Sequence, residues 1–168
     1  QNEVERLRKR ARFGREGRAR RGDIAHVPPY GYAWQFGEGG TRALVVDDTA
    51  AAVVRDIIAR YLAGAGQITI AADLTARGVP TPSGGSTWQK NSVNVILWRV
   101  WTYAGYAEYY RGHSPTKYDA ARYIRAPGNH PAIVDDATAA SVQAEREARR
   151  ANRRIADTPS RLTGIVWC

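Results

Sequence analysis

The sequence has no methionine, and its single cysteine, Cys168, is the last of its 168 residues. One cysteine cannot form a disulfide within the chain, so a fold held together by disulfides is excluded. No apolar run approaches the length of a membrane span, and the Arg-rich beginning has no apolar signal core. These absences predict a soluble cytoplasmic protein without a membrane partner. The lack of methionine, with Gln1 at one end and Cys168 at the other, suggests a fragment of a longer chain.

Basic residues outnumber acidic ones, 25 to 16, so the net charge is +9 and a polyanionic partner is expected. The excess lies near the two ends. Residues 1–22 carry a net charge of +6 and residues 145–161 a net charge of +3, which leaves the middle of the chain neutral. The alternative for each segment is a solvated charged helix.

The first part of the neutral region predicts a small hairpin followed by a buried helix. Residues 32–36 alternate as in a strand, GEGGTR forms a turn, and ALVVD returns. Asp47 or Asp48 then caps a helix that runs to about Ala63 and ends at Gly64. The side chains expected to face inward from this helix are Val53, Val54, Ile57, Ile58, Tyr61 and Leu62.

Two further helices, joined by a long turn, are predicted between Gln67 and Trp98. The first has an apolar stripe and is stopped by Gly78 and Pro80. The second, from Thr87 to Trp98, has an apolar stripe and an opposite polar face. The three helices together match the usual minimum of a helix-turn-helix domain. The apolar stripes consist of Ile70, Ala71 and Leu74, and of Val93, Ile96, Leu97 and Val100, and the polar face of Thr87, Lys90, Asn91, Asn94 and Trp98.

The polar face of the second helix has two interpretations. Asn and Lys are side chains that read base edges, Asn at adenine and Lys at guanine. Polar exposed faces are also common on helices that never touch nucleic acid. The basic ends of the chain favour the first interpretation.

The N-terminal segment predicts a helix to about Phe13 and then an extended basic arm. Gly14, Gly17 and Gly22 each weaken a helix by about 1 kcal/mol relative to Ala. An arm that carries Arg18, Arg20 and Arg21 can lie in a minor groove, or it is disordered until it binds.

Beyond Arg99, TYAGYAEYYRG and KYDAARYIRAPG predict two strands around a polar turn with His113, Ser114 and Pro115 near its tip. Asp135 or Asp136 then caps a second charged helix. The last run, RLTGIVWC, is apolar and strand-like.

Several phrases, in order and with fitting spacing, resemble the recombinase domain of the large serine recombinases, the phage integrases and transposon-type resolvases. They are ARRGDIAHVPPYGYAW, the region from VVDDTAAAVVRDIIARYLAG to SVNVIL, HPAIVDDATAASVQ and RLTGIVWC. The chain departs from the family at WRVWTYAG, where the family usually has Asn-Pro and one residue fewer. The expected fold is therefore α+β, with a helix-turn-helix-like three-helix core and small β-hairpins after the end of a long helix and a basic linker.

The resemblance implies three segments. Residues 1–22 would be the end of an inter-domain helix and its linker, 23–161 the DNA-binding domain, and 162–168 the link into a zinc ribbon in which Cys168 is the first ligand. Double-stranded DNA of an attachment site would be the partner of a parent that acts as a dimer or tetramer, while the fragment is a monomer. The residues expected to contact DNA are Arg18, Arg20, Arg21, Thr87, Gln89, Lys90, Asn91, Asn94 and Arg99.

No catalytic, cofactor or metal site is expected within these residues. In the family the nucleophilic serine lies in a separate N-terminal domain, and the six serines here have no local base. The three histidines, His26, His113 and His130, lack ligand spacing. Two alternatives to the recombinase remain. The first is an independent helix-turn-helix regulator of transcription. The second and weaker one is an RNA-binding domain, which no paired aromatic stacking motif on a strand supports.

Overall fold

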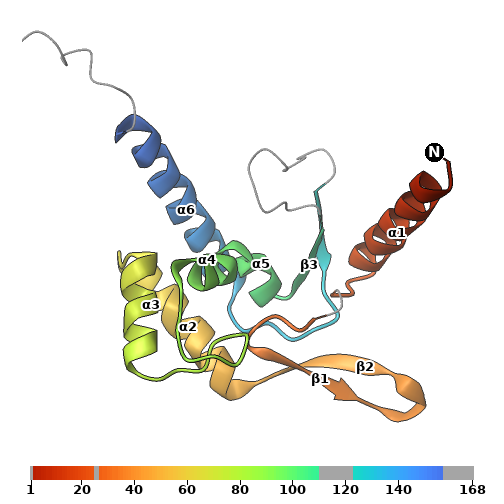
Figure 1. Ribbon diagram of the computed structural model, residues 1–168, viewed down its shortest axis with the longest axis horizontal. Coiled ribbons are helices and arrows are strands. Elements are labelled where there is room, and N and C mark those ends of the chain that lie inside the picture. Colours follow the sequence, from red (N-terminus) through yellow and green to blue (C-terminus); the bar gives the residue numbers. More distant parts are fainter. Residues whose placement is uncertain (1, 25–26, 110–122, 157–168) are drawn as a thin grey trace, which may run out of the picture.

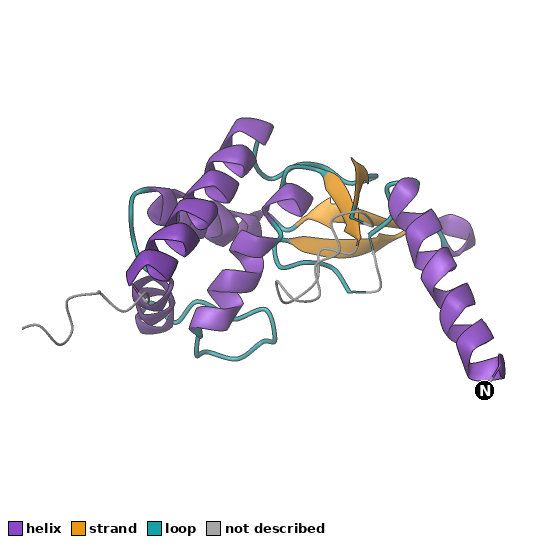
Figure 2. Ribbon diagram, turned by 90° about the horizontal axis from the view of Figure 1, so that it is seen from above, coloured by secondary structure: helices purple, strands orange, loops and turns teal. Residues whose placement is uncertain are grey.

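The computed structural model describes residues 2–24, 27–109 and 123–156 (Figure 1). Within these ranges, helices gather at one end of the molecule, two antiparallel hairpins lie in the middle, and α1 projects at the other end (Figure 2). The predicted α+β class with a three-helix core and small hairpins is confirmed. The expected turn around His113 and the run 161–168 lie outside the described residues.

The first hairpin pairs β1 (Tyr32–Phe36) with β2 (Arg42–Val46), as predicted, and the pairing runs from Tyr32 opposite Val46 to Phe36 opposite Arg42. Its base enters the core through a buried Tyr32. Gly31, just before β1, has a φ of 97°, and a Cβ there would lie 3.0 Å from Ile133 Cδ1. A glycine is therefore required where the hairpin meets the core.

The three-helix core consists of α2 (Asp48–Leu62), α3 (Gln67–Ala76) and α4 (Lys90–Trp98). Asp47 is the N-cap of α2, since its carboxylate accepts a hydrogen bond from the Ala50 amide at 3.1 Å. The prediction that Leu62 faces inward was wrong: it is the last residue of α2 and is 39% exposed. The side chains that fill the core include Val54, Ile57, Ile70, Leu74, Val93, Ile96 and Leu97.

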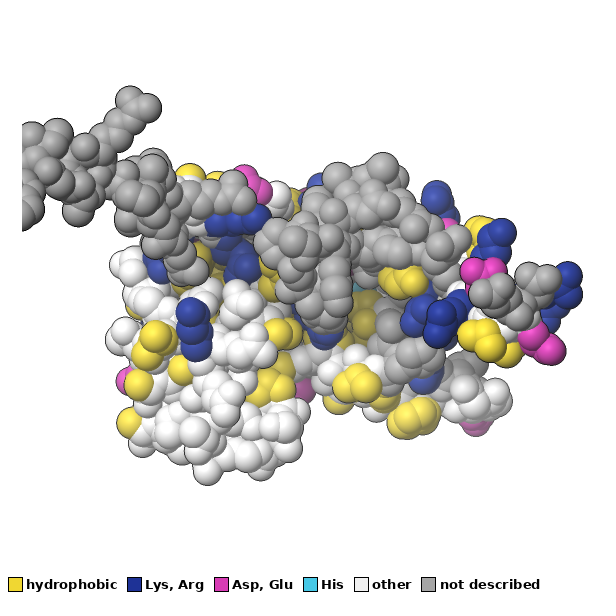
Figure 3. Space-filling model, turned by 45° about the horizontal axis from the view of Figure 1, so that its top comes forward, with side chains coloured by type: hydrophobic (Ala, Val, Ile, Leu, Met, Phe, Trp, Pro, Cys, Tyr) yellow, Lys and Arg dark blue, Asp and Glu magenta, His cyan; other side chains and the backbone are white. Residues whose placement is uncertain are grey.

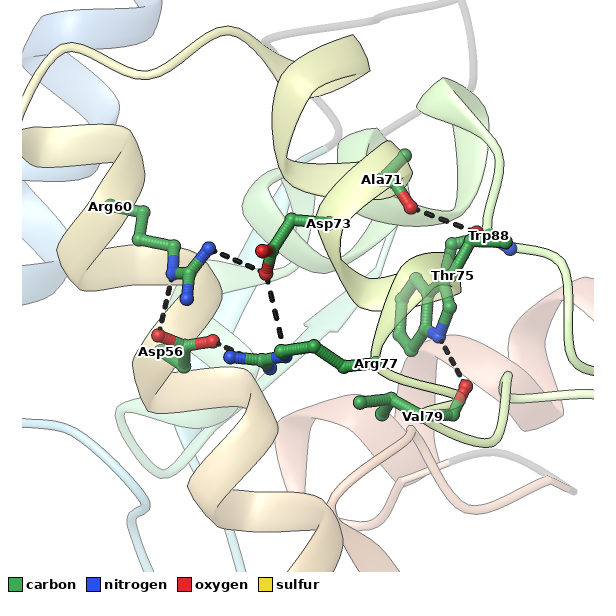
Figure 4. Close-up of polar contacts among 8 residues, drawn as sticks. All are labelled: Asp56, Arg60, Ala71, Asp73, Thr75, Arg77, Val79 and Trp88. Carbon is green, nitrogen blue, oxygen red and sulfur yellow. Dashed lines mark hydrogen bonds and ion pairs between the residues drawn. The ribbon is translucent and has the colours of Figure 1, made fainter.

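Four alternating charges join α2 to α3 on the surface (Figure 4). Arg60 contacts Asp56 at 2.8 Å and Asp73 at 2.7 Å, and Arg77 contacts the same two carboxylates at 3.0 and 3.4 Å. A single surface ion pair contributes about 0–1 kcal/mol, but a closed network of four groups also fixes geometry. It therefore holds α3 in one orientation against α2.

The N-terminal helix α1 runs from Asn2 to Arg20, so the prediction of an extended arm after Phe13 was wrong. A Schellman motif ends the helix, in which Gly22, at a φ of 83°, donates to Ala19 O and Asp23 donates to Arg18 O. The end is then fastened from far along the sequence, because the Asn129 side chain donates to Arg21 O at 2.7 Å. These contacts offset the helix-weakening effect of the two internal glycines.

After α4, the chain bends at Arg99 into the short helix α5 (Val100–Tyr103), so the strand predicted to begin near Thr102 starts later. Helical spacing is favoured here because it buries both Val100 and Tyr103. The second hairpin then pairs β3 (Tyr106–Tyr109) with β4 (Ile124–Pro127).

The C-terminal helix α6 (Asp136–Ala156) is capped by Asp135, whose carboxylate accepts from the Thr138 amide at 2.7 Å. Ala139 and Val142 bury its first half in the core. Its second half carries charged side chains past α4 and α3. Among the described residues, no helix is long and apolar enough to cross a membrane.

Candidate nucleic-acid interface

The helix with the polar face begins at Lys90, so the predicted start at Thr87 was three residues too early. The cause is Trp88, which is buried and whose backbone amide and indole both donate hydrogen bonds outside α4 (Figure 4). Its amide donates to Thr75 Oγ1 at 2.9 Å, and its indole Nε1 donates to the Val79 carbonyl at 2.8 Å. Thr87 therefore lies in the turn, and Gln89 is the N-cap residue of α4.

The turn before α4 is also fastened to the segment that precedes β1. Tyr30 donates its hydroxyl hydrogen to Pro80 O at 3.0 Å, and its ring meets Trp88 edge-on at 5.5 Å. Within the turn, the Thr81 side chain accepts from the Gly85 amide at 2.9 Å. Contacts from two directions thus fix where α4 begins.

The polar face of α4 divides into two parts. Lys90 and Asn91 are exposed at its N-terminal end. Asn94, one turn later, is half-buried, and its Oδ1 accepts from Gln67 Nε2 at 3.4 Å and from Arg146 Nη1 at 3.2 Å. The side chains of Lys90 and Asn91 are thus presented to a ligand, whereas the Asn94 carbonyl joins α4 to α3 and α6.

A groove of about 770 Å³ runs along this face between α3, α4 and α6. Four of its lining side chains are cationic, and none is acidic. They are Lys90 from α4 and Arg146, Arg149 and Arg150 from α6. The arginines were missing from the expected contact set, although their spacing of three and four residues on a charged helix places them on one face.

The opposite side of α4 borders a second groove, of about 650 Å³, which is less basic. Exposed Arg99 and Asp47 both line it, beside the prolines 28 and 29. Burial raises the pKa of Tyr103 and of Tyr30, and the nearby Asp47 raises that of Tyr30 further. Both tyrosine hydroxyls therefore stay neutral. The negative charge of Asp47 offsets the positive charge of Arg99 in this groove.

The three arginines expected in the linker are not brought together with α4. Arg18, Arg20 and Arg21 lie at the end of α1, which packs on the second hairpin away from α4 (Figure 1). Arg21 also forms an ion pair with Asp23, with 3.8 Å between Arg21 Nε and Asp23 Oδ2. Figure 3 shows the basic side chains of one face near α6 and along α1, with mainly uncharged polar surface around the turn before α4.

The other candidate groups have structural surroundings. His130 Nε2 lies 2.7 Å from Thr102 O, its ring meets Tyr32 edge-on, and burial lowers its pKa. Ser141 donates its hydroxyl hydrogen to Ala137 O at 2.8 Å. In the described ranges, no three His, Cys, Asp or Glu side chains gather as metal ligands would.

These features define a helix-turn-helix-like domain in which α4, with its N-terminal polar side chains exposed, is flanked by two grooves, one of them basic. The family model described as Recombinase matches residues 48–149, more than half of the chain, and the chain therefore belongs to the Recombinase family. The resemblance to the recombinase domain of the large serine recombinases is confirmed.

A solved structure described as "Crystal Structure of a LSR-DNA Complex" has a similar fold, with a TM-score of 0.61 and 17% sequence identity. The match covers 90% of this chain and 43% of that one, so this chain spans less than half of that structure. No curated protein matches the sequence.

Proposed function

We propose that this chain binds double-stranded DNA sequence-specifically, at one arm of an attachment site, as the DNA-binding part of a site-specific serine recombinase. The observation that carries the proposal is the presentation of Lys90 and Asn91 at the start of α4, a helix whose position is fixed by Trp88 and Tyr30. Family membership supports it, and the structurally similar protein is described as a complex with DNA.

Each exposed side chain of α4 has a distinct role in this proposal. The Asn91 amide both donates and accepts, as reading an adenine edge in the major groove requires. Lys90 binds either a guanine or a phosphate. Gln89, Thr87 and Arg99 contact the backbone at the groove edges, and Asn94 orients α4 through Gln67 and Arg146 instead of meeting a base.

Arg18 and Arg20 in the last turn of α1, and Arg21 just after it, contact the phosphate backbone from the end of a helix and not as an extended arm in a minor groove. In this proposal the chain itself requires no cofactor and cuts no DNA, while the parent protein acts as a dimer or tetramer and binds zinc, with Cys168 as a candidate ligand. Incubation with supercoiled DNA, with and without magnesium, should therefore leave the DNA uncut. Nicking that copurifies with the chain would refute this part of the proposal.

The test of base reading begins with selection of preferred sites from a random duplex library. Binding of Asn91→Ala is then measured on the selected site and on its single-base variants at one salt concentration. It should lose about 1–3 kcal/mol on the selected site and relax preference at one base pair. Lys90→Ala relaxes preference at a guanine if Lys90 reads a base, and weakens all sequences alike if it binds phosphate.

The matched control is Gln35→Ala, which removes an exposed amide from β1. It should bind as the unchanged chain does. If Asn91→Ala and Lys90→Ala both keep the full base preference, recognition does not lie on α4 and the proposal fails.

A further inference from the structure

We propose that the basic groove between α3, α4 and α6 binds the phosphodiester backbone of one DNA strand, with Arg150 as its principal phosphate contact. This inference rests on the proposed function and adds a site to it, on a helix that the expected contact set did not include. The other groove beside α4 lacks this character, because Asp47 opposes Arg99 there.

The three arginines of α6 that line the groove have different surroundings. Arg149 is engaged in the fold: it donates to Glu145 at 2.6 Å and to the carbonyls of Ala65 and Tyr61, both at 2.9 Å. It therefore holds α6 against the end of α2. Arg146 contacts α4, where its guanidinium lies 5.3 Å from the Trp98 ring and donates to Asn94.

Arg150 is exposed in the same groove, and among the described residues its guanidinium has no carboxylate partner. It lies four residues after Arg146, so the two like charges are neighbours on one face of α6 and repel each other. A polyanion bound between them removes this repulsion. The guanidinium fork also matches phosphate oxygens in geometry.

The opposite wall of the groove is formed by the beginning of α3. Gln67 and Thr69 offer uncharged polar side chains there. Lys90 stands at the α4 side of the same groove and continues the row of cations toward the exposed Asn91. A strand in the groove would thus lie directly beside the helix face that meets the bases, as the backbone that borders a major groove does.

The experiment compares Arg150→Gln with Arg42→Gln, which removes one exposed cation from β2. Both variants change the net charge equally. Affinity for a mixed-sequence duplex of about two helical turns, roughly 20 base pairs, is measured from low to high salt. Loss of one phosphate contact should make the negative slope of log affinity against log salt shallower by about 0.9. Between about 1 M and 0.1 M salt, the affinity of the variant should therefore rise roughly eight-fold less than that of the unchanged chain.

Arg42→Gln should leave the slope and affinity unchanged, and both variants should stay folded at the temperature of the binding measurement. On the selected site, Arg150→Gln should keep the full preference among single-base variants, since a phosphate contact carries no base information. Equal slopes for Arg150→Gln and the unchanged chain would refute the groove assignment, even where Asn91→Ala still alters base preference. A change in base preference with Arg150→Gln would also refute it. If the unchanged chain shows no salt-dependent binding to duplex DNA, the proposed function itself fails.

Discussion

The hydrogen bond between the Trp88 amide and Thr75 Oγ1 sets the beginning of α4, and its loss can be measured with Thr75→Val. The Thr75 hydroxyl accepts from Trp88 N at 2.9 Å and donates to Ala71 O at 2.9 Å. Valine has nearly the same shape and a similar helix propensity. Ala71 O keeps its backbone partner within α3, so the substitution leaves the Trp88 amide as the group without a partner.

An orphaned buried donor costs about 1–3 kcal/mol. Thr75→Ser is the matched control, because it keeps the hydroxyl and removes one methyl group, which costs at most about 0.8 kcal/mol. Urea denaturation should therefore show a lower free energy of unfolding for Thr75→Val than for Thr75→Ser, with the same denaturant slope. The Trp88 amide should also exchange its hydrogen faster in the valine variant.

The reasoning is refuted if Thr75→Val is as stable as Thr75→Ser, or more stable. Such a result would mean that water or a small shift satisfies the Trp88 amide at no cost. The position of α4 would then depend on the Trp88 ring and the Val79 carbonyl, and not on α3.

Three further predictions test the N-cap of α2, the glycines in and just after α1, and a half-buried histidine. Asp47→Ala should lower the urea-unfolding free energy by about 0.5–2 kcal/mol, and Asp47→Asn by much less. Gly22→Ala should release the end of α1 in hydrogen exchange, because its Cβ would lie 2.4 Å from Pro127 O; Gly14→Ala, whose Cβ meets nothing within 4 Å, should stabilise α1 by about 1 kcal/mol. Burial lowers the pKa of His130, so this histidine stabilises the fold fully above its ordinary pKa of about 6.5 and less as the pH falls below it; NMR titration and unfolding of the chain and of His130→Gln between about pH 5 and 7 check this.

Elements with local signals could be predicted from the sequence. The alternation of residues 32–36 and the turn after them were sufficient for the first hairpin, and Asp47 and Gly64 marked the ends of α2. In these cases the interactions that determine the structure join residues that are near in sequence. The polar end of α4 was found in the same way, since helical spacing alone separates Asn91 from Val93 and Leu97.

The errors arose where distant residues determine local structure. The end of α1 is fastened by Asn129, more than 100 residues later, whose side chain donates to the carbonyl of Arg21 just beyond the helix. The helix α5 replaces the beginning of a strand because Tyr103 O accepts from the amides of both Ile133 and Val134, at 2.7 and 3.1 Å. Neither partner could be inferred from spacing, because nothing in the local sequence marks it.

Asn94 shows why the composition of a helix face does not give the role of each side chain on it. Its spacing relative to Asn91 placed both amides on one face and predicted that both face outward. In the structure, α6 packs against this face, and Arg146 and Gln67 both donate hydrogen bonds to the side-chain carbonyl of Asn94. Because α6 packs here, Asn94 holds α4 in place while Asn91 stays exposed. The same packing brings Arg146, Arg149 and Arg150 of α6 beside α4. The surface proposed to meet DNA thus comprises α4 and α6 together.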